Sequence, residues 1–303
     1  MKNHKLLLPL LLLAFQLGAS CEQLTKKPQP PYSSNFIKSK FGYDLDQPDQ
    51  KYFMGYELEE ISGISYYGPQ LLACVQDEEG KLYVYSLQEK KVIQRIKFNK
   101  SGDYEGVEII DNMAYVLRSD GQLFKFSTEQ ETEASTEKIE TPLSIKNDAE
   151  GLGYHPQLDL LLIACKGQGE IDEKKVKGKA VYGFKIKEQQ FVDKPLFSIT
   201  KKDIKKFLKT EAEDKKQTDF SPSAIAWHPL EHRYYILASV GRVLVVVNPE
   251  FEIEEFIRLH PKTYKQPEGI CFAPNGDMYI ASEGRTGDGY ILEFKYKQDL
   301  ESN

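Results

Sequence analysis

The sequence predicts an all-β protein, a five-bladed β-propeller, from three observations. Five short units recur along the chain, each marked by a small residue in the same local setting. Each unit continues with a turn and then further short strands rich in β-branched and aromatic residues. No helical pattern alternates with these strands, and their period differs from that of a β-sandwich. Several short strands per unit, separated by turns, are typical of propeller blades.

The small residue of each unit fixes the phase of the repeat. Its positions are 43, 45, 73 and 45 residues apart, at Gly63, Gly106, Gly151, Ala224 and Gly269. Innermost strands converge on the propeller axis, and a glycine or alanine there lets neighbouring backbones approach closely. We therefore expect the innermost strand of every blade to pass through one of these positions.

The ring is expected to close with an N-terminal strand. The last unit lacks a fourth strand, whereas the segment KYFMGYELE at 51–59 precedes the first unit and is spare. Pairing it with the outside of the last blade removes a free sheet edge. The predicted propeller domain spans residues 51–298. We call the face that carries the connections between blades, and the loops between second and third strands, the top face. The loops between first and second strands lie on the bottom face.

The long step between the third and fourth units contains two insertions, at about 167–179 and 200–218. Both fall on the top face as surface additions. In the second, Thr200 with Asp203 predicts a helix N-cap, and apolar residues within 204–208 form one stripe of a short helix.

The N-terminus predicts export. Lys2 and Lys5 precede an apolar run from Leu6 to Leu17, and small residues follow, as in a secretory signal peptide over residues 1–20. The run is shorter than the ~20 residues that cross a bilayer. Small residues directly before Cys21 resemble the lipobox of bacterial lipoproteins, which implies that Cys21 is acylated. An ordinary secretory signal cleaved nearby is the alternative.

Lipidation at Cys21 defines the expected location and domain order. Residues 21–50 are polar and proline-bearing, which predicts a flexible tether. The protein is then a lipoprotein of the bacterial cell envelope, held to a membrane by its lipid and either periplasm-facing or on the outer membrane.

Composition argues against several function classes. The 303 residues include 40 Lys and Arg against 46 Asp and Glu, and removing residues 1–20 takes two lysines and no acid, so the formal net charge goes from −6 to −8. Lysines scattered among carboxylates do not indicate a nucleic-acid binder. Three cysteines remain after Cys21, all within apolar runs and without zinc-site spacing: Cys74, Cys165 and Cys271. We expect buried, unpaired thiols.

Acidic residues stand directly before the small residue in three of the five units, where side chains meet at the mouth of the central channel. The residues at the mouth are Ser62, Glu105, Glu150, Ser223 and Glu268, and two places earlier stand Glu60, Asp103, Asp148, Ser221 and Gln266. Crowded carboxylates raise each other's pKa unless a cation is present. Ca²⁺ accepts six to eight oxygen ligands in irregular geometry. The alternative is that these acids bond to loop amides or pair with lysines.

An ordered set of motifs resembles the SdiA-regulated family of bacterial envelope proteins. The motifs are ELEEISGIS, GDYEGVEII, NDAEGLGY and QPEGICFAPNGDMYIASE, and the likeness covers most of 52–296. The resemblance implies a five-bladed propeller, distantly similar to NHL-repeat proteins, with a calcium ion in a shared site. Glu105, Glu150 and Glu268 match the family's acids.

Positions after the second strands carry the other acids of the expected site. Family members often have acids there; Asp77 and Glu283 fit, whereas Arg118 and Lys166 stand at such places in this chain. Ser221 also stands where an acid is common. The ligand set implied by the resemblance is therefore reduced in this sequence.

The favoured function is non-enzymatic binding or scaffolding at the cell envelope, through an acidic and calcium-loaded top face that meets an unknown ligand or protein. The alternative is a calcium-dependent hydrolase of phosphoester, lactone or ester substrates, by analogy of fold alone. Its general base would be His260, the histidine expected near the channel, or one of the carboxylates, notably Asp77 or Glu283. No G-x-S-x-G or H-E-x-x-H motif occurs.

Overall fold

The structure is a computed structural model that describes residues 42–172, 174–208, 218–284 and 287–297. The expected signal peptide over 1–20, Cys21 and most of the expected tether lie outside the described residues. Within that described part, no helix has the length and apolar character needed to cross a membrane.

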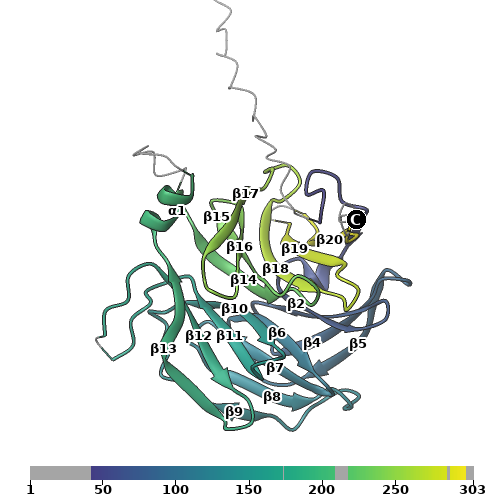
Figure 1. The fold of residues 1–303 in the computed structure, drawn as a ribbon. Coiled ribbons are helices and arrows are strands. Elements are labelled where there is room, and N and C mark those ends of the chain that lie inside the picture. The colour runs from purple at the N-terminus through teal and green to yellow at the C-terminus, as the bar shows by residue number, and fades with distance from the viewer. Residues whose placement is uncertain (1–41, 173, 209–217, 285–286, 298–303) are drawn as a thin grey trace, which may run out of the picture. The chain divides into compact units, whose positions relative to one another are not determined.

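The described residues form five four-stranded antiparallel sheets, one for each repeated unit (Figure 1). Blade 1 contains β2 (Ile61–Gly68), β3 (Leu71–Gln76), β4 (Lys81–Ser86) and β5 (Lys91–Lys97). Blade 2 contains β6 (Tyr104–Ile110), β7 (Met113–Arg118), β8 (Leu123–Ser127) and β9 (Glu137–Ile139). Blade 3 contains β10 (Ala149–His155), β11 (Leu160–Cys165), β12 (Lys179–Lys185) and β13 (Gln190–Ile199). Blade 4 contains β14 (Ser221–Trp227), β15 (Tyr234–Val240), β16 (Val243–Val247) and β17 (Ile253–Arg258). Blade 5 contains β18 (Gln266–Phe272), β19 (Met278–Glu283), β20 (Tyr290–Phe294) and β1 (Gln50–Phe53).

The innermost strands form a closed ring. Strand β2 contacts β6, β6 contacts β10, and the series continues through β14 and β18 back to β2. A Cβ atom added at Gly63 would lie 2.9 Å from the carbonyl oxygen of Glu105 on the next blade. One added at Gly106 would lie 2.6 Å from the Cβ atom of Leu152. The predicted need for a small residue at these positions is confirmed, because any side chain would collide with the neighbouring blade.

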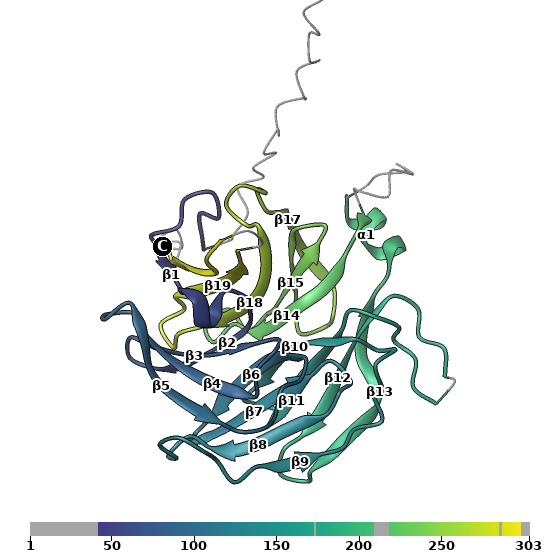
Figure 2. The same cartoon turned by 180° about the vertical axis from the view of Figure 1, so that it is seen from behind.

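The predicted closure is also confirmed. Strand β1 pairs antiparallel with β20, and Figure 2 shows it beside the strands of blade 5. The Tyr52 hydroxyl donates a 2.7 Å hydrogen bond to Oε2 of Glu293 on β20. The closing strand is shorter than the expected segment 51–59. Gly55 has a positive φ of 70°, and a 3₁₀ turn, η1 (Tyr56–Leu58), follows it.

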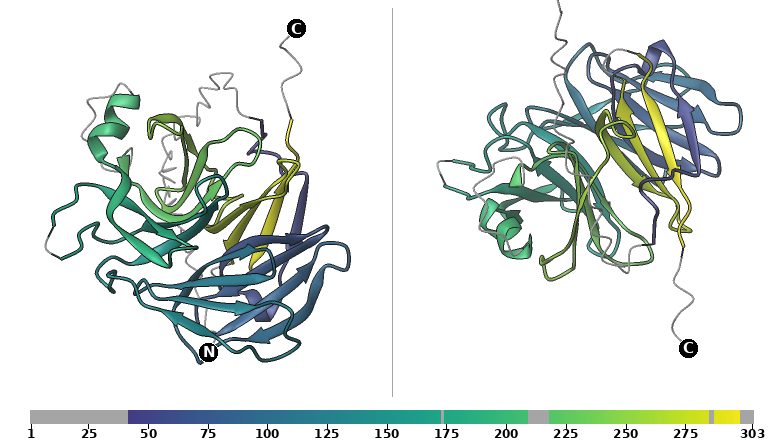
Figure 3. Two further views of the ribbon diagram at one scale, coloured as in Figure 1. Left: turned by 60° about the horizontal axis from the view of Figure 1, so that its bottom comes forward. Right: turned by 90° about the horizontal axis from the view of Figure 1, so that it is seen from above.

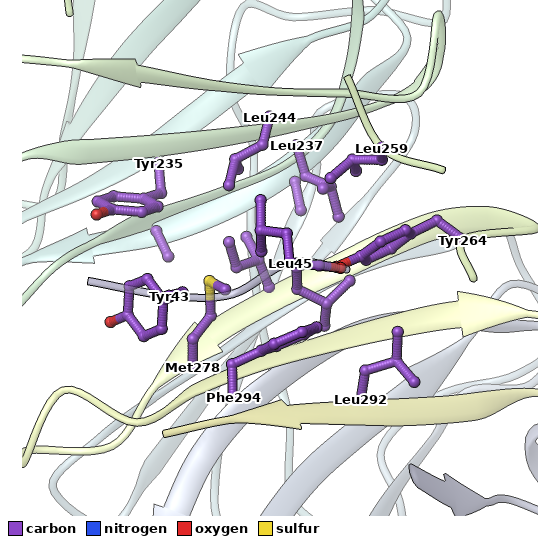
Figure 4. Close-up of a cluster of buried hydrophobic side chains, with 14 of the residues drawn as sticks. Tyr43, Leu45, Tyr235, Leu237, Leu244, Leu259, Tyr264, Met278, Leu292 and Phe294 are labelled. Atoms are coloured by element: carbon purple, nitrogen blue, oxygen red, sulfur yellow. The ribbon is translucent and has the colours of Figure 1, made fainter. Parts of the chain in front are cut away.

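The folded domain begins earlier than the expected boundary at residue 51. Tyr43 and Leu45 are buried in a hydrophobic cluster between blades 4 and 5 (Figure 4). The Tyr43 hydroxyl donates to the carbonyl oxygen of Gly276 at 2.5 Å, and the Tyr264 hydroxyl donates to that of Leu45 at 2.8 Å. The end of the expected tether 21–50 therefore belongs to the core. The sequence did not indicate this, because Tyr43 and Leu45 stand among polar residues.

Helix α1 (Lys201–Leu208) confirms the expected N-cap and corrects the expected role of its insertion. The Asp203 amide donates to Thr200 Oγ1 at 3.2 Å, and the Thr200 amide donates to Asp203 Oδ2 at 2.9 Å. The helix lies at the periphery of the ring (Figure 3). Ile204 is only 1% exposed and belongs to the hydrophobic cluster of blades 3 and 4. The described part of this insertion is thus joined to the core; residues 209–217 lie outside the described part.

The three remaining cysteines behave as expected. Cys74, Cys165 and Cys271 are buried and unpaired in the second or first strands of their blades. Burial raises the pKa of each thiol, which keeps it protonated and unreactive at neutral pH.

Candidate functional site

The pairing of the innermost strand with the second strand is irregular at one equivalent position in every blade. In blade 2 the register passes from Tyr104 to Gly106, and in blade 3 from Ala149 to Gly151. The same shift occurs in the other three blades. The residues skipped are Ser62, Glu105, Glu150, Ser223 and Glu268. A β-bulge leaves its extra residue unpaired and redirects the side chain. These are the five residues that the sequence places at the channel mouth.

The two serines at these bulges join neighbouring blades. Ser62 Oγ donates to the carbonyl oxygen of Tyr104 at 2.6 Å, and Ser223 Oγ donates to that of Pro267 at 2.8 Å. Each acceptor directly precedes a bulge glutamate of the next blade. The serines are therefore used as structural links, whereas blades 2, 3 and 5 supply glutamates.

A second set of side chains follows the second strand of each blade. The strand registers make Asp77, Ser119, Lys166, Ser239 and Glu283 equivalent. The sequence-based placement of Arg118 in this set is wrong by one residue, because Arg118 is the last residue paired with the inner strand and is equivalent to Gln76 and Cys165. Arg118 instead pairs with Asp120 at 2.6 Å and also donates to Gln122.

Three bulge glutamates form the centre of the site. Burial, aided by Glu150 and Asp103, raises the pKa of Glu105 to about 10. Burial also raises the pKa of Glu150 to about 8 and that of Glu268 to about 7. Glu105, Glu150 and Glu268 repel one another, since each negative charge disfavours ionisation of the next.

The other predicted acids surround this centre. Burial raises the pKa of Asp77 to about 6, and the charges of Glu60, Glu283 and Asp103 act in the same direction. Glu283 accepts a hydrogen bond from the Gln266 amide and opposes ionisation of Glu268. Asp148 opposes ionisation of Glu150. All eight predicted acids therefore act on one electrostatic cluster, which we call the acidic cluster: Glu60, Asp77, Asp103, Glu105, Asp148, Glu150, Glu268 and Glu283.

A lysine lies within the acidic cluster. Lys166 Nζ donates a hydrogen bond to Glu150 Oε1, and its charge favours ionisation of Glu150 and Glu268. Burial acts to lower the pKa of Lys166, but the bond to Glu150 and the nearby carboxylates outweigh it and raise that pKa. From the sequence, Lys166 stands where family members often have an acid. The sequence does not show that its ammonium group bonds to Glu150.

The loop that carries Lys166 is held by a residue that the sequence did not single out. Asn147 is buried, and its Nδ2 donates to the carbonyl oxygens of Gln168 and Glu170, each at 2.9 Å. Lys179 Nζ donates to the carbonyl oxygen of Lys166. Asn147 and Lys179 thus position the start of the first insertion at the channel mouth. In the sequence, Asn147 could have been noticed as the residue directly before Asp148 in the motif NDAEGLGY.

The fit of the cluster to a metal ion is mixed. Carboxylate oxygens are the ligands of hard cations, and Asp77 Oδ1 is buried without a hydrogen-bond partner. The described side chains nevertheless contain no group of three or more Asp, Glu, His or Cys arranged to hold a metal ion. The Lys166 ammonium group supplies one positive charge where such an ion would compete for Glu150.

His260 has a local structural role in the connection between β17 and β18. Its Nδ1 accepts a hydrogen bond from the Lys262 amide at 3.2 Å, and its carbonyl oxygen accepts one from the Tyr264 amide at 2.9 Å. These contacts stabilise the turn that leads into β18.

A family model described as SdiA-regulated matches residues 34–285 of this sequence. The chain belongs to the SdiA-regulated family. No curated protein matches the sequence.

Several solved structures are similar to this SdiA-regulated chain at low sequence identity. The PQQ-bound aldose sugar dehydrogenase from Streptomyces coelicolor is 13% identical, with a TM-score of 0.52, over 82% of this chain and 97% of that one. A luciferin-regenerating enzyme is 13% identical, with a TM-score of 0.49, over 82% and 95%. A structural genomics protein of unknown function from Bacteroides thetaiotaomicron is 12% identical, with a TM-score of 0.49, over 76% and 53%. At 13% identity the likeness to the dehydrogenase concerns the fold alone.

Proposed function

We propose that this protein is a non-enzymatic binding or scaffold protein of the bacterial cell envelope, whose acidic cluster holds a calcium ion and presents the top face to a ligand or protein. The observation that carries the proposal is the set of bulges, which leaves glutamates of three blades at equivalent unpaired positions where their charges oppose one another's ionisation. Keeping several carboxylates buried and close together is costly unless a cation compensates them.

Calcium suits this donor set better than magnesium. It takes six to eight oxygen ligands at irregular angles, whereas Mg²⁺ demands near-octahedral geometry. Glu105, Glu150 and Glu268 would hold the ion, and Asp77 and Glu283 would complete the set. The buried Asp77 Oδ1, which lacks a partner, supports a role for Asp77 as a ligand.

Lys166 determines how the ion would bind. Its ammonium group is bonded to Oε1 of Glu150, so a calcium ion at Glu150 would either displace that group or bind beside its positive charge. Removing Lys166 should therefore increase the affinity for calcium. If Lys166 is instead the permanent counter-ion of the cluster, removing it should destabilise the fold without creating a calcium response.

The experiment is a thermal unfolding titration with Ca²⁺ in chelator-treated protein, with Mg²⁺ as the control ion. Calcium at about 100 times its Kd should stabilise the fold by about 2.7 kcal/mol. The double variant E105Q/E150Q should abolish this stabilisation, and Lys166→Met should shift the titration to lower calcium. If adding calcium left the melting temperature unchanged in both the wild type and Lys166→Met, the proposal would be contradicted.

Membrane attachment through a lipid on Cys21 forms part of the proposed function. Its support is the run of small residues before Cys21, which follows a basic and then apolar N-terminal segment. Several acyl chains, as on a bacterial lipoprotein, give stable attachment where one chain gives only marginal binding.

The hydrolase alternative has no specific observation in its favour. The Nδ1 atom of His260, its proposed base, accepts a hydrogen bond within its own turn. The calcium titration should therefore show stabilisation without calcium-dependent turnover of esters, lactones or phosphoesters.

A further inference from the structure

The bottom end of the central channel holds a pocket of about 310 Å³. All five blades contribute to its lining, among others through Tyr66, Glu108, Tyr154, Trp227 and Phe272. Prolines of the turns between first and second strands complete its rim. This volume is at the small end of the range for ligand pockets, ~300–1,000 Å³. The pocket lies at the opposite end of the innermost strands from the acidic cluster.

The equivalent positions of the five innermost strands differ sharply in this pocket. Two residues after the small residue of each unit stand Ser65, Glu108, Gly153, Ala226 and Cys271. Four of them are small residues without a carboxyl group, and burial raises the pKa of the Cys271 thiol so that it stays protonated. Glu108 is the exception. Packing of the inner strands does not call for a carboxylate there.

Glu108 is held in place by uncharged groups. Its Oε2 accepts a 3.0 Å hydrogen bond from Ser65 Oγ, which in turn accepts one from the Ile109 amide at 3.1 Å. Among the described residues, no lysine, arginine or histidine forms an ion pair with it. Burial raises the pKa of Glu108 to about 8, although the hydrogen bonds of Ser65 and of the Ile109 and Tyr154 amides oppose this.

The walls of the pocket are aromatic. Tyr66, Tyr154, Trp227 and Phe272 come from four different blades. Trp227 stacks on His155 with ring centroids 3.9 Å apart, and burial lowers the pKa of His155, so that this ring is neutral. The described lining residues include no basic side chain. Faces of aromatic rings attract cations, and this attraction strengthens where water is excluded.

We propose that this pocket binds a small organic ammonium ion, with Glu108 as the counter-charge and the aromatic side chains against the alkyl groups. A calcium ion does not fit, because one carboxylate and one hydroxyl fall far short of six oxygen ligands. An anion is disfavoured by Glu108 and the lack of a basic lining residue. The site is separate from the acidic cluster, so this inference goes beyond the proposed function.

The test is calorimetric titration of the full chain with two ammonium ions and their neutral counterparts at about pH 9. At that pH the Glu108 carboxyl, whose pKa is about 8, is mostly ionised even in the empty pocket, and both ammonium ions keep their charge. Choline is compared with 3,3-dimethylbutan-1-ol, and butylamine with butan-1-ol. We expect at least one ammonium ion to bind with a Kd below about 1 mM and about tenfold or more tighter than its counterpart.

Two variants separate charge from aromatic packing. Glu108→Gln keeps the size and the bond from Ser65, and it should weaken ammonium binding about tenfold or more. Phe272→Leu keeps the charge and should weaken binding about threefold to tenfold. Glu188→Gln, an exposed residue of the turn between β12 and β13, is the matched control and should bind as the wild type does.

Clear results would overturn the inference. Neither ammonium ion binding below about 10 mM, or neutral counterparts binding as tightly as the cations, would exclude an ammonium site. Unchanged binding in a folded Glu108→Gln protein would show that the ion binds elsewhere. The calcium response should be the same in Glu108→Gln and in the wild type, so this test and that of the acidic cluster fail independently.

Discussion

The ammonium group of Lys166 donates a hydrogen bond to Oε1 of Glu150 within the same blade. Glu150 occupies the bulge of β10, and Lys166 directly follows β11. This contact explains why the pKa values of Glu105 and Glu150 differ. Burial raises the pKa of Glu105 to about 10 but that of Glu150 only to about 8, because Lys166 opposes the effect at Glu150. The cluster is thus neutralised unevenly, on the side of blade 3.

Replacing Lys166 tests this contact. We expect Lys166→Met to destabilise calcium-free protein by about 1–3 kcal/mol, because it leaves the buried Glu150 carboxylate without its partner. Urea unfolding at about pH 8, where Glu150 is partly ionised, measures the change. The control is Lys146→Met, since Lys146 is exposed in the preceding connection.

A double-mutant cycle with Glu150→Gln isolates the pair. Glu150→Gln should destabilise the fold less in the Lys166→Met background than in the wild type. In that background it removes a carboxylate that has lost its lysine partner. Additivity of the two changes within about 0.5 kcal/mol would show that the contact contributes nothing to stability.

The blades and the acids of the mouth could be predicted because both follow from a repeat. The close approach at Gly63 and Gly106 admits no side chain, so these residues mark the axis in the sequence. A glutamate directly before such a residue must then lie in the bulge. The mistake at Arg118 concerns the end of the second strand, which the repeat does not mark; the pairing of Arg118 with Tyr104 gives the position to Ser119.

Other features depend on contacts between distant parts of the chain. The direction of the Lys166 side chain depends on a loop held by Asn147 and Lys179. Tyr43 is buried only because blades 4 and 5 leave room for it, and no local pattern shows that. The sequence does show Glu108 as an acid between apolar residues in the strand GVEII. That it is the one carboxylate among the five equivalent positions of the inner strands becomes clear only from the strand registers.

The segment before β1 should contribute to stability. Leu45 packs in the cluster between blades 4 and 5, so Leu45→Ala should cost about 2–3 kcal/mol through lost burial and a residual cavity. Chemical denaturation gives the change directly. Leu158→Ala is the matched control, because Leu158 is 58% exposed in a turn of blade 3 and its loss should be nearly neutral. Equal effects of the two substitutions would show that the segment is not part of the stable fold.

Lipidation predicts a change in partitioning. The wild-type protein should enter the detergent phase in a phase-separation assay and incorporate labelled fatty acid, whereas Cys21→Ser should do neither. Cys271→Ser serves as the control, since this thiol is buried in β18. A mature protein whose first residue lies beyond Cys21 would contradict the prediction.

The pKa values of the bulge glutamates imply an unusual dependence of stability on pH. Folding raises the pKa of Glu105 from 4.5 to about 10 and that of Glu268 to about 7. The native state therefore retains protons that the unfolded state has released. The resulting stability is fully present below about pH 4.5 and is lost as the pH rises through the folded-state values. In calcium-free protein, this contribution should fall steadily from about pH 5 to about pH 9.

Glu105→Gln should flatten this decline. A glutamine does not ionise, so the variant loses up to about 1.4 kcal/mol per pH unit of the slope over the range in which only unfolded Glu105 is ionised. The measurement is the free energy of unfolding at several pH values with chelator present, for the wild type, for Glu105→Gln and for the exposed control Glu188→Gln. The control should follow the wild-type curve. Parallel curves for all three proteins would mean that Glu105 ionises in the native state as freely as in water. In the wild type, the stabilisation by calcium should be largest at about pH 9. At that pH the ion binds carboxylates that have already lost their protons, so binding does not have to release protons.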